Sequence, residues 1–259
     1  MTPEILILAG LAGFAAGMLD SIVGGGGLIM TPAMINLFPG VPILNLIATT
    51  RTSSIAGTSV SAWNYLRSVR VDRRILLAAP LSAASFSLIG VSLAKRMDQE
   101  VLKLVVLALC VALAVYTFIR KDLGQELKFQ PDAPYVVSGA ILVGAVTGFY
   151  NGLIGPGTGT LMVFGFVSVM GLDFLRASAA AKVTNITSDL SSWLVLMFSG
   201  YVMWAVVLPL IAGNMLGSYF GSRLAILKGS RFIRWVFLVV VIALIARGSY
   251  DFFRSQTPL

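Results

Sequence analysis

Two cations inside apolar segments, Arg51 and Lys182, carry the clearest chemistry in this sequence. Charged side chains are costly in a membrane helix, and they usually face the bundle interior, where they serve a function. Polar residues follow each cation after three, seven and ten positions, which places them on one helical face. They are Ser54, Thr58 and Ser61 after Arg51, and Asn185, Asp189 and Ser192 after Lys182. The spacing predicts two matched polar stripes, each headed by a cation.

Each stripe is preceded by an apolar segment that glycines interrupt. The first break is Gly24 to Gly27, and the second is Gly155-Pro156-Gly157-Thr158-Gly159. Glycine costs about 1 kcal/mol in a helix relative to alanine, and a broken helix in lipid is tolerated where its freed backbone faces protein or a water-filled cavity. N–H groups at helix N-termini attract anions. We therefore expect a substrate anion site made from both halves, formed by Arg51, Lys182, Ser54, Asn185, Gly24, Gly25, Gly26, Gly155, Gly157 and Thr158.

Two other interpretations of the cations stay open. Arg51 and Lys182 could lie near a membrane interface and extend to the headgroups, or they could form structural ion pairs with Asp20 or Asp189. These two carboxylates lie deep in apolar segments. They are candidates for proton coupling, because a desolvated carboxylate can bind and release a proton, or they balance the charge of the cations.

The composition indicates a polytopic helical membrane protein. The chain has 259 residues, of which 57% are hydrophobic and 12% charged, against about 25% charged residues in soluble domains. The mean hydropathy is +0.90. The net charge of +8 fits Lys and Arg at cytoplasmic helix ends and does not call for nucleic acid as a partner. The first apolar run has no basic region and no cleavage motif, so we expect it to stay as a membrane segment.

Several classes of site are excluded. The chain has no histidine, and its one cysteine, Cys110, lies in an apolar segment, so we expect no metal site, no cofactor and no enzyme activity. The glycine runs lack a Walker lysine and a preceding strand, which argues against an ATP-driven pump. The expected partners are a small anion and membrane lipid.

Apolar runs long enough for a helix span recur along the chain. We expect an all-α fold with eight full spans and two short segments after the breaks. The spans are Glu4–Val23, Leu44–Leu66, Ile75–Ala94, Val101–Ile119, Tyr135–Ile154, Ala177–Ser199, Val202–Ile226 and Phe232–Phe253, and the short segments are Leu28–Phe38 and Leu161–Met170. The polar linker 120–134 divides an N-terminal unit, 1–119, from a C-terminal unit, 135–259.

The two units form an internal repeat with an offset of 131 positions, as in Gly13 and Gly144. The loop Arg67–Arg74 contains four arginines, whereas its counterpart Phe198–Ala205 has no Lys or Arg. Because cytoplasmic loops collect these residues, the pattern favours an inverted repeat; re-entrant short segments would instead make the halves parallel. Small-residue spacings such as Gly213/Gly217/Gly221 predict close helix packing, either within the chain or in a homodimer.

Four segments make a family resemblance visible. GMLDSIVGGGGLIMTPAM, GFYNGLIGPGTGTL, AAAKVTNITSDLSS and LAILKGSRFIR resemble the TauE/SafE family of membrane transporters, also described as sulfite exporter or toluenesulfonate-uptake permease-like, over nearly the whole chain. In the bacterial branch that it most resembles, named only as membrane transporter protein, a Thr-Asn-Lys sequence is common where this chain has Thr49-Thr50-Arg51. The resemblance implies transport of sulfite, thiosulfate or organosulfonates.

The sequence thus predicts a secondary transporter that exports small sulfur-containing anions across the bacterial inner membrane. A potential of about 100 mV, negative inside, is worth roughly 2.3 kcal/mol per charge and favours monoanion export about 50-fold. The alternatives are a passive anion channel and a proton-coupled importer of a small organic anion.

Overall fold

The computed structural model describes residues 3–94, 129–130, 134–153 and 155–255, with side chains as far as residue 239. This part of the chain is helical and contains no strand. The helices are α1 (Pro3–Val23), α2 (Gly26–Leu37), α3 (Ile43–Ser68), α4 (Arg73–Ala94), α6 (Val136–Leu153), α7 (Thr158–Met170), α8 (Phe174–Phe198) and α9 (Trp204–Ser255). The expected segment Val101–Ile119, with Cys110, and most of the linker 120–134 lie outside the described residues.

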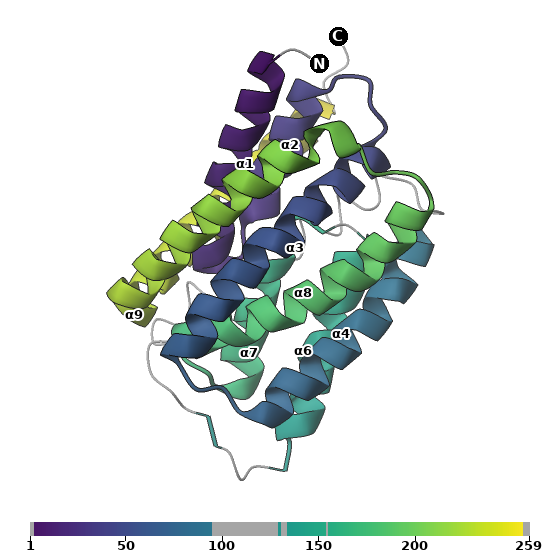
Figure 1. Ribbon diagram of the computed structural model, residues 1–259. Coiled ribbons are helices and arrows are strands. Elements are labelled where there is room, and N and C mark those ends of the chain that lie inside the picture. The colour runs from purple at the N-terminus through teal and green to yellow at the C-terminus, as the bar shows by residue number, and fades with distance from the viewer. Residues whose placement is uncertain (1–2, 95–128, 131–133, 154, 256–259) are drawn as a thin grey trace.

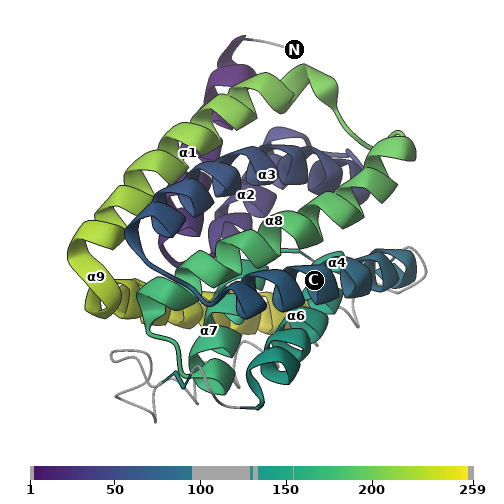
Figure 2. The ribbon, with the colours of Figure 1, turned by 60° about the horizontal axis from the view of Figure 1, so that its bottom comes forward.

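The polar helices α3 and α8 occupy the middle of the molecule. Figures 1 and 2 both show them between a pair formed by α1 and α9 and a second pair formed by α4 and α6. The contacts agree, because α3 packs against α9 and α8, and α8 packs against α4. The apolar pairs on the outside therefore shield the helices that carry the two predicted stripes.

Both outer pairs pack through glycines, as the small-residue spacing predicts. A Cβ on Gly217 would lie 2.0 Å from the main-chain oxygen of Phe14, and one on Gly144 would lie 2.3 Å from that of Ala79. These positions cannot take a side chain unless the helices separate. The stripe Gly213/Gly217/Gly221 is used against α1 of the same chain, which favours its packing role within the chain.

Both predicted helix breaks are present. Gly24 separates α1 from α2 and Gly155 separates α6 from α7, with φ of +83° and +87°. Residues with a side chain rarely adopt this left-handed conformation. The two breaks also meet in space, because a Cβ on Gly24 would lie 2.1 Å from the carbonyl carbon of Gly159. The backbones of the two segments thus touch directly.

Four described helices are long and apolar enough to cross a membrane: α1, α4, α6 and α9 over Trp204–Val239. α2 and α7 are shorter apolar helices, as expected of the segments after the breaks. α3 has 26 residues and α8 has 25, enough for a span at about 1.5 Å per residue, but their polar stripes lower their hydropathy. The total of eight spans stays a prediction.

The last two predicted spans are joined in one element. α9 contains a kink at Gly229, where φ is +71° and ψ is −173°. Glycine allows this conformation inside an otherwise continuous helix. The kink lies between the expected segments Val202–Ile226 and Phe232–Phe253, so the sequence located both pieces.

Candidate functional site

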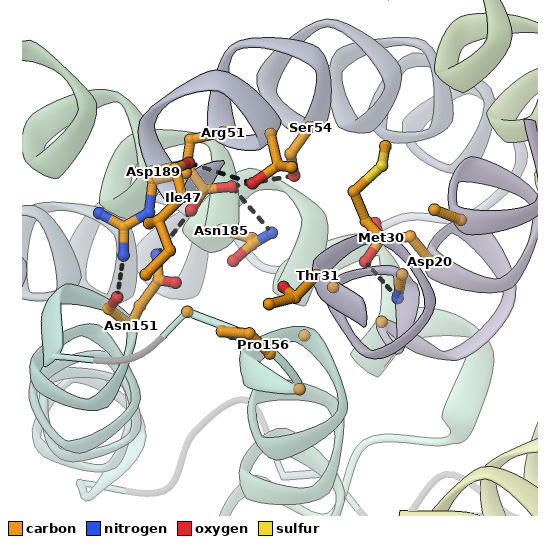
Figure 3. A pocket seen from close by; sticks show the side chains of 18 of the residues that line it. Asp20, Met30, Thr31, Ile47, Arg51, Ser54, Asn151, Pro156, Asn185 and Asp189 are labelled. Carbon is orange, nitrogen blue, oxygen red and sulfur yellow. Dashed lines mark hydrogen bonds between the residues drawn. The ribbon is translucent and has the colours of Figure 1, made fainter. Parts of the chain in front are cut away.

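A small cavity lies where the two helix breaks meet α3 and α8. Its volume is about 60 Å³, and since one water needs about 10–15 Å³ on this measure, it has room for a small anion. Figure 3 shows its lining side chains, which converge from both halves of the chain. The lining comprises Ala16, Asp20, Gly24, Gly26, Gly27, Met30, Thr31, Ile47, Thr50, Arg51, Ser54, Asn151, Gly155, Pro156, Gly157, Gly159, Asn185, Asp189 and Asn214.

Arg51 reaches this cavity from the first half of α3. Its side chain is buried, and Nη2 donates a hydrogen bond to the main-chain oxygen of Asn151 in the last turn of α6. Its Nε and Nη1 are buried with no hydrogen-bond partner among the described residues. A Cβ at Gly155 would lie 3.3 Å from Nη2, so the glycine lets the break approach the guanidinium. Arg51 therefore brings unused donors to a buried site.

Asp189 faces the same cavity from α8 and is surrounded by neutral donors. Its Oδ1 accepts from Asn151 Nδ2 at 2.8 Å, and its Oδ2 accepts from Ser54 Oγ at 3.1 Å and from Asn185 Nδ2 at 3.5 Å. Within the described residues no cation lies within 4.0 Å of this carboxylate, although Arg51 attracts it over a longer distance. The network joins α3, α6 and α8.

Lys182 has a different environment from Arg51, although the two have matched positions in the sequence. Its Nζ is 2.9 Å from Asp20 Oδ2 and also donates to the main-chain oxygen of Asp20. Asp20 further accepts from Thr58 Oγ1 at 3.3 Å and from the Gly26 N–H at 3.4 Å. The structure thus favours the ion-pair interpretation for Lys182, with α8 fixed to the break between α1 and α2.

The structure brings most of the predicted site residues together. Arg51, Ser54, Asn185, Gly24, Gly26, Gly155 and Gly157 line the cavity, and so do the two candidates for proton coupling, Asp20 and Asp189. Lys182, Gly25 and Thr158 do not line it. Gly25 precedes α2 as its N-cap, and the Thr158 hydroxyl lies 2.6 Å from the Gly155 oxygen and 3.1 Å from Asn151 Oδ1.

The burial of both cations bears on the snorkelling alternative. Arg51 is 5% exposed and Lys182 is 1% exposed. A side chain that extends to lipid headgroups keeps its charged end at the surface of the fold. Both cations instead point inward to partners on other helices, which does not fit that alternative.

The N-termini of α2 and α7 border the cavity from opposite breaks. Gly26 is the first residue of α2, and Gly157 is the N-cap of α7; both line the cavity. The helix dipole makes such ends electropositive, although the Gly26 N–H already donates to Asp20 Oδ1 at 3.4 Å. They add partial positive charge to that of Arg51.

Two amides escaped the site prediction. Asn151 was not among the predicted site residues, yet it accepts from Arg51 and Thr158 and donates to Asp189. Asn214 lies on α9 and contacts α3 so closely that a Cβ on Gly57 would be 1.8 Å from its Oδ1. The sequence contained a feature that could have identified both residues, because each is a lone amide in an apolar segment beside a glycine repeat.

Comparison with known proteins gives consistent matches. A protein-family model described as Sulfite exporter TauE/SafE matches residues 9–248. The chain is similar to "Probable membrane transporter protein ORF9" of Sinorhizobium sp, with 34% identity covering 94% of this chain and 92% of the relative. It is also similar to "Probable membrane transporter protein" of Haemophilus influenzae, with 31% identity over 96% of both chains.

A third relative has a similar name, identity and coverage. "Probable membrane transporter protein YfcA" of Escherichia coli K12 is 30% identical over 97% of this chain and 92% of its own length. No solved structure shows a significant match. The family model covers most of the chain, and each of the three relatives, whose names read "Probable membrane transporter protein", matches over more than nine-tenths of its own length. The chain therefore belongs to the sulfite exporter TauE/SafE family of membrane proteins.

Proposed function

We propose that the chain is a secondary transporter that exports small sulfur-containing anions, such as sulfite, thiosulfate or organosulfonates, across the bacterial inner membrane. The cavity between the two breaks is its binding site. Support comes from the family, whose description names sulfite export, and from the size and donors of the cavity.

The observation that carries the proposal is the guanidinium of Arg51. A buried donor without an acceptor costs roughly 1–3 kcal/mol, and more when it is charged. Nε and Nη1 of Arg51 are both in that condition, next to a cavity bordered by two helix N-termini. An anion in the cavity would satisfy these donors and restore the stabilisation they lack.

The direction follows from the membrane potential. A carrier that moves a monoanion without a coupling ion is driven outward by roughly 2.3 kcal/mol per 100 mV. Import would need proton or other coupling, and for a proton Asp189 is placed better than Asp20, because Asp20 is paired with Lys182 at 2.9 Å.

We also propose that the units 1–119 and 135–259 form an inverted repeat around the site. α1 packs with α9 and α6 packs with α4, so each outer pair joins the first helix of one unit to a later helix of the other. In Figure 1, α1 begins at the end marked N, whereas α6 begins at the opposite end of the molecule. This arrangement supports opposite orientations for the two units.

The proposal is tested by flux in proteoliposomes that contain the full chain. Sulfite, thiosulfate and sulfoacetate are offered to wild type, to Arg51→Gln and to Arg67→Gln. Arg67 lies on the same helix but is exposed and stacks on Trp63 at 4.2 Å, so it is a matched control. We expect saturable flux that falls at least about tenfold in Arg51→Gln, because hydrogen bonds to charged groups contribute about 1.5–3 kcal/mol.

Other outcomes have distinct meanings. Equal flux in wild type and Arg51→Gln, with both proteins monodisperse, would remove Arg51 from the site. Flux that never saturates with anion concentration would indicate the passive channel. If none of the three anions moves in wild type, the proposed cargo is wrong.

A further inference from the structure

The residues that line the cavity include one with an unused acceptor, as well as Arg51 with its unused donors. Asn185 lines it from α8, is 5% exposed, and has its Nδ2 committed to Asp189. Its Oδ1 is buried with no partner among the described residues. The amide turns its NH₂ group toward Asp189 Oδ2, at 3.5 Å, and a carboxylate accepts from that group. Figure 3 shows the nitrogen toward Asp189 and the oxygen on the other side.

An unpartnered acceptor is informative because a simple anion cannot satisfy it. Sulfite as a dianion, thiosulfate and methanesulfonate offer only acceptor oxygens. Placed beside the Asn185 oxygen, each would leave the same group unpaired and add repulsion between lone pairs. A cargo that carries one proton could donate to Asn185 and accept from Arg51 at the same time.

The charges of the residues around the cavity also favour a monoanion over a dianion. Arg51 and Lys182 are opposed by Asp20 and Asp189, so the charges of these four buried residues sum to zero when all are ionised. Lys182 is already paired with Asp20, and the free donors belong to Arg51. Burying a second uncompensated negative charge in a site of this kind is costly, which disfavours a dianion.

We propose that the cargo is a monoanionic oxyanion that retains one acidic proton, such as hydrogensulfite, with its oxygens on Arg51 and its proton on the Asn185 oxygen. This inference rests on the proposed function and narrows it. Arg51 and Asn185, which carry these donors and this acceptor, both line one cavity of about 60 Å³, which suits a single small anion that contacts both.

The test compares two monoanions in proteoliposomes with the full chain: sulfite over a pH series, and methanesulfonate, which has a methyl group in place of the protonated oxygen. At a pH where hydrogensulfite predominates, we expect it to move about tenfold faster than methanesulfonate, the factor that corresponds to one hydrogen bond of about 1.4 kcal/mol. Above the pKa of hydrogensulfite, sulfite flux should fall about tenfold per pH unit. The methanesulfonate flux at each pH corrects for titration of Asp189, Asp20, Lys182 and Arg51.

A variant pair assigns the effect to Asn185. Asn185→Leu removes the acceptor with a side chain of similar branching, and the ratio of the two fluxes should fall toward one. Asn36→Leu makes the same change at an exposed position of α2 and should keep the wild-type ratio. If Asn185→Leu does not fold, the comparison of hydrogensulfite and methanesulfonate flux in wild type still tests the inference.

Equal wild-type rates for hydrogensulfite and methanesulfonate, with the same pH profile, would overturn this inference and leave the proposed function intact. Flux that rises as the dianion predominates would do the same. If neither monoanion moves, and thiosulfate and sulfoacetate do not move either, the proposed function fails and this inference fails with it.

Discussion

The contact between the two helix breaks can be tested with three alanine substitutions. Gly24 has φ of +83° and its Cβ would lie 2.1 Å from the carbonyl carbon of Gly159. Gly40 has φ of +86° and nothing within 4 Å of its Cβ. Gly159 lies in α7, and its Cβ would be 2.5 Å from the Gly24 Cα. The three glycines therefore separate backbone strain from close packing.

The expected magnitudes follow from these two costs. The left-handed conformation costs an alanine about 1–2 kcal/mol, and overfilling a packed site costs about 1–3 kcal/mol more. Gly40→Ala meets the first cost, Gly159→Ala the second, and Gly24→Ala both. For a chain of this size 1 kcal/mol corresponds to about 2–4 °C in melting temperature. We expect decreases of about 5 °C for each single-cost variant and about 10 °C for Gly24→Ala.

The assay is thermal unfolding of the purified protein in detergent, followed by the far-ultraviolet circular dichroism of the helices. Monodispersity by size-exclusion chromatography before heating ensures that folded samples are compared. Equal decreases for Gly24→Ala and Gly40→Ala, with no decrease for Gly159→Ala, would refute the direct contact between the breaks. Backbone strain alone would then explain the decrease in melting temperature for Gly24→Ala.

Further predictions concern a buried ion pair, the cap of α4 and the cavity. Lys182→Ala leaves Asp20 buried without its cation and should destabilise the protein by about 3–5 kcal/mol. The double variant Asp20→Asn/Lys182→Met removes both charges and should regain much of the lost melting temperature. A double variant that melts no higher than Lys182→Ala would contradict the pairing. Asp72 caps α4 by accepting from the Arg74 N–H at 2.8 Å, so Asp72→Ala should cost about 1 kcal/mol in the same assay. The hydrogen bond from the Arg74 side chain lowers the pKa of Asp72. The stabilisation that ionised Asp72 contributes is therefore present above its unfolded-state pKa and is lost as the pH falls through its folded-state pKa. Wild type and Asp72→Asn should converge in melting temperature in acid, and a difference in melting temperature that does not change with pH would refute this. Asn214→Leu, at an amide that lines the cavity, should reduce anion flux more than Asn36→Leu.

The helix breaks and the polar stripes could be predicted because they depend on local properties. Four glycines in a row disfavour a helix whatever surrounds them, and spacings of three, seven and ten positions share a helical face. The close approach of α1 to α9 also has a local signal in the four-residue repeat of Gly213 and Gly217. The elements of the site were therefore visible in the sequence.

The partners of the cations could not be predicted in the same way. Arg51 and Lys182 hold matched positions, yet Lys182 meets a carboxylate whereas Arg51 meets a main-chain oxygen. The difference arises because Asp20 has Asn151 as its counterpart in the other half. Which carboxylate each cation reaches depends on how α3 and α8 rotate against the breaks, and that rotation is set by packing across the whole bundle.

The bond between Arg51 and Asn151 has a consequence for how the site communicates with the fold. Asn151 belongs to the last turn of α6, where main-chain oxygens lack a partner within the helix. Arg51 both supplies that partner and faces the cavity. A guanidinium drawn toward the proposed anion would weaken or strengthen its bond to the end of α6, and by thermodynamic reciprocity a change at the end of α6 would alter the affinity for that anion. In the proposed transporter, occupancy of the cavity and the conformation of the second break would be linked through a single side chain.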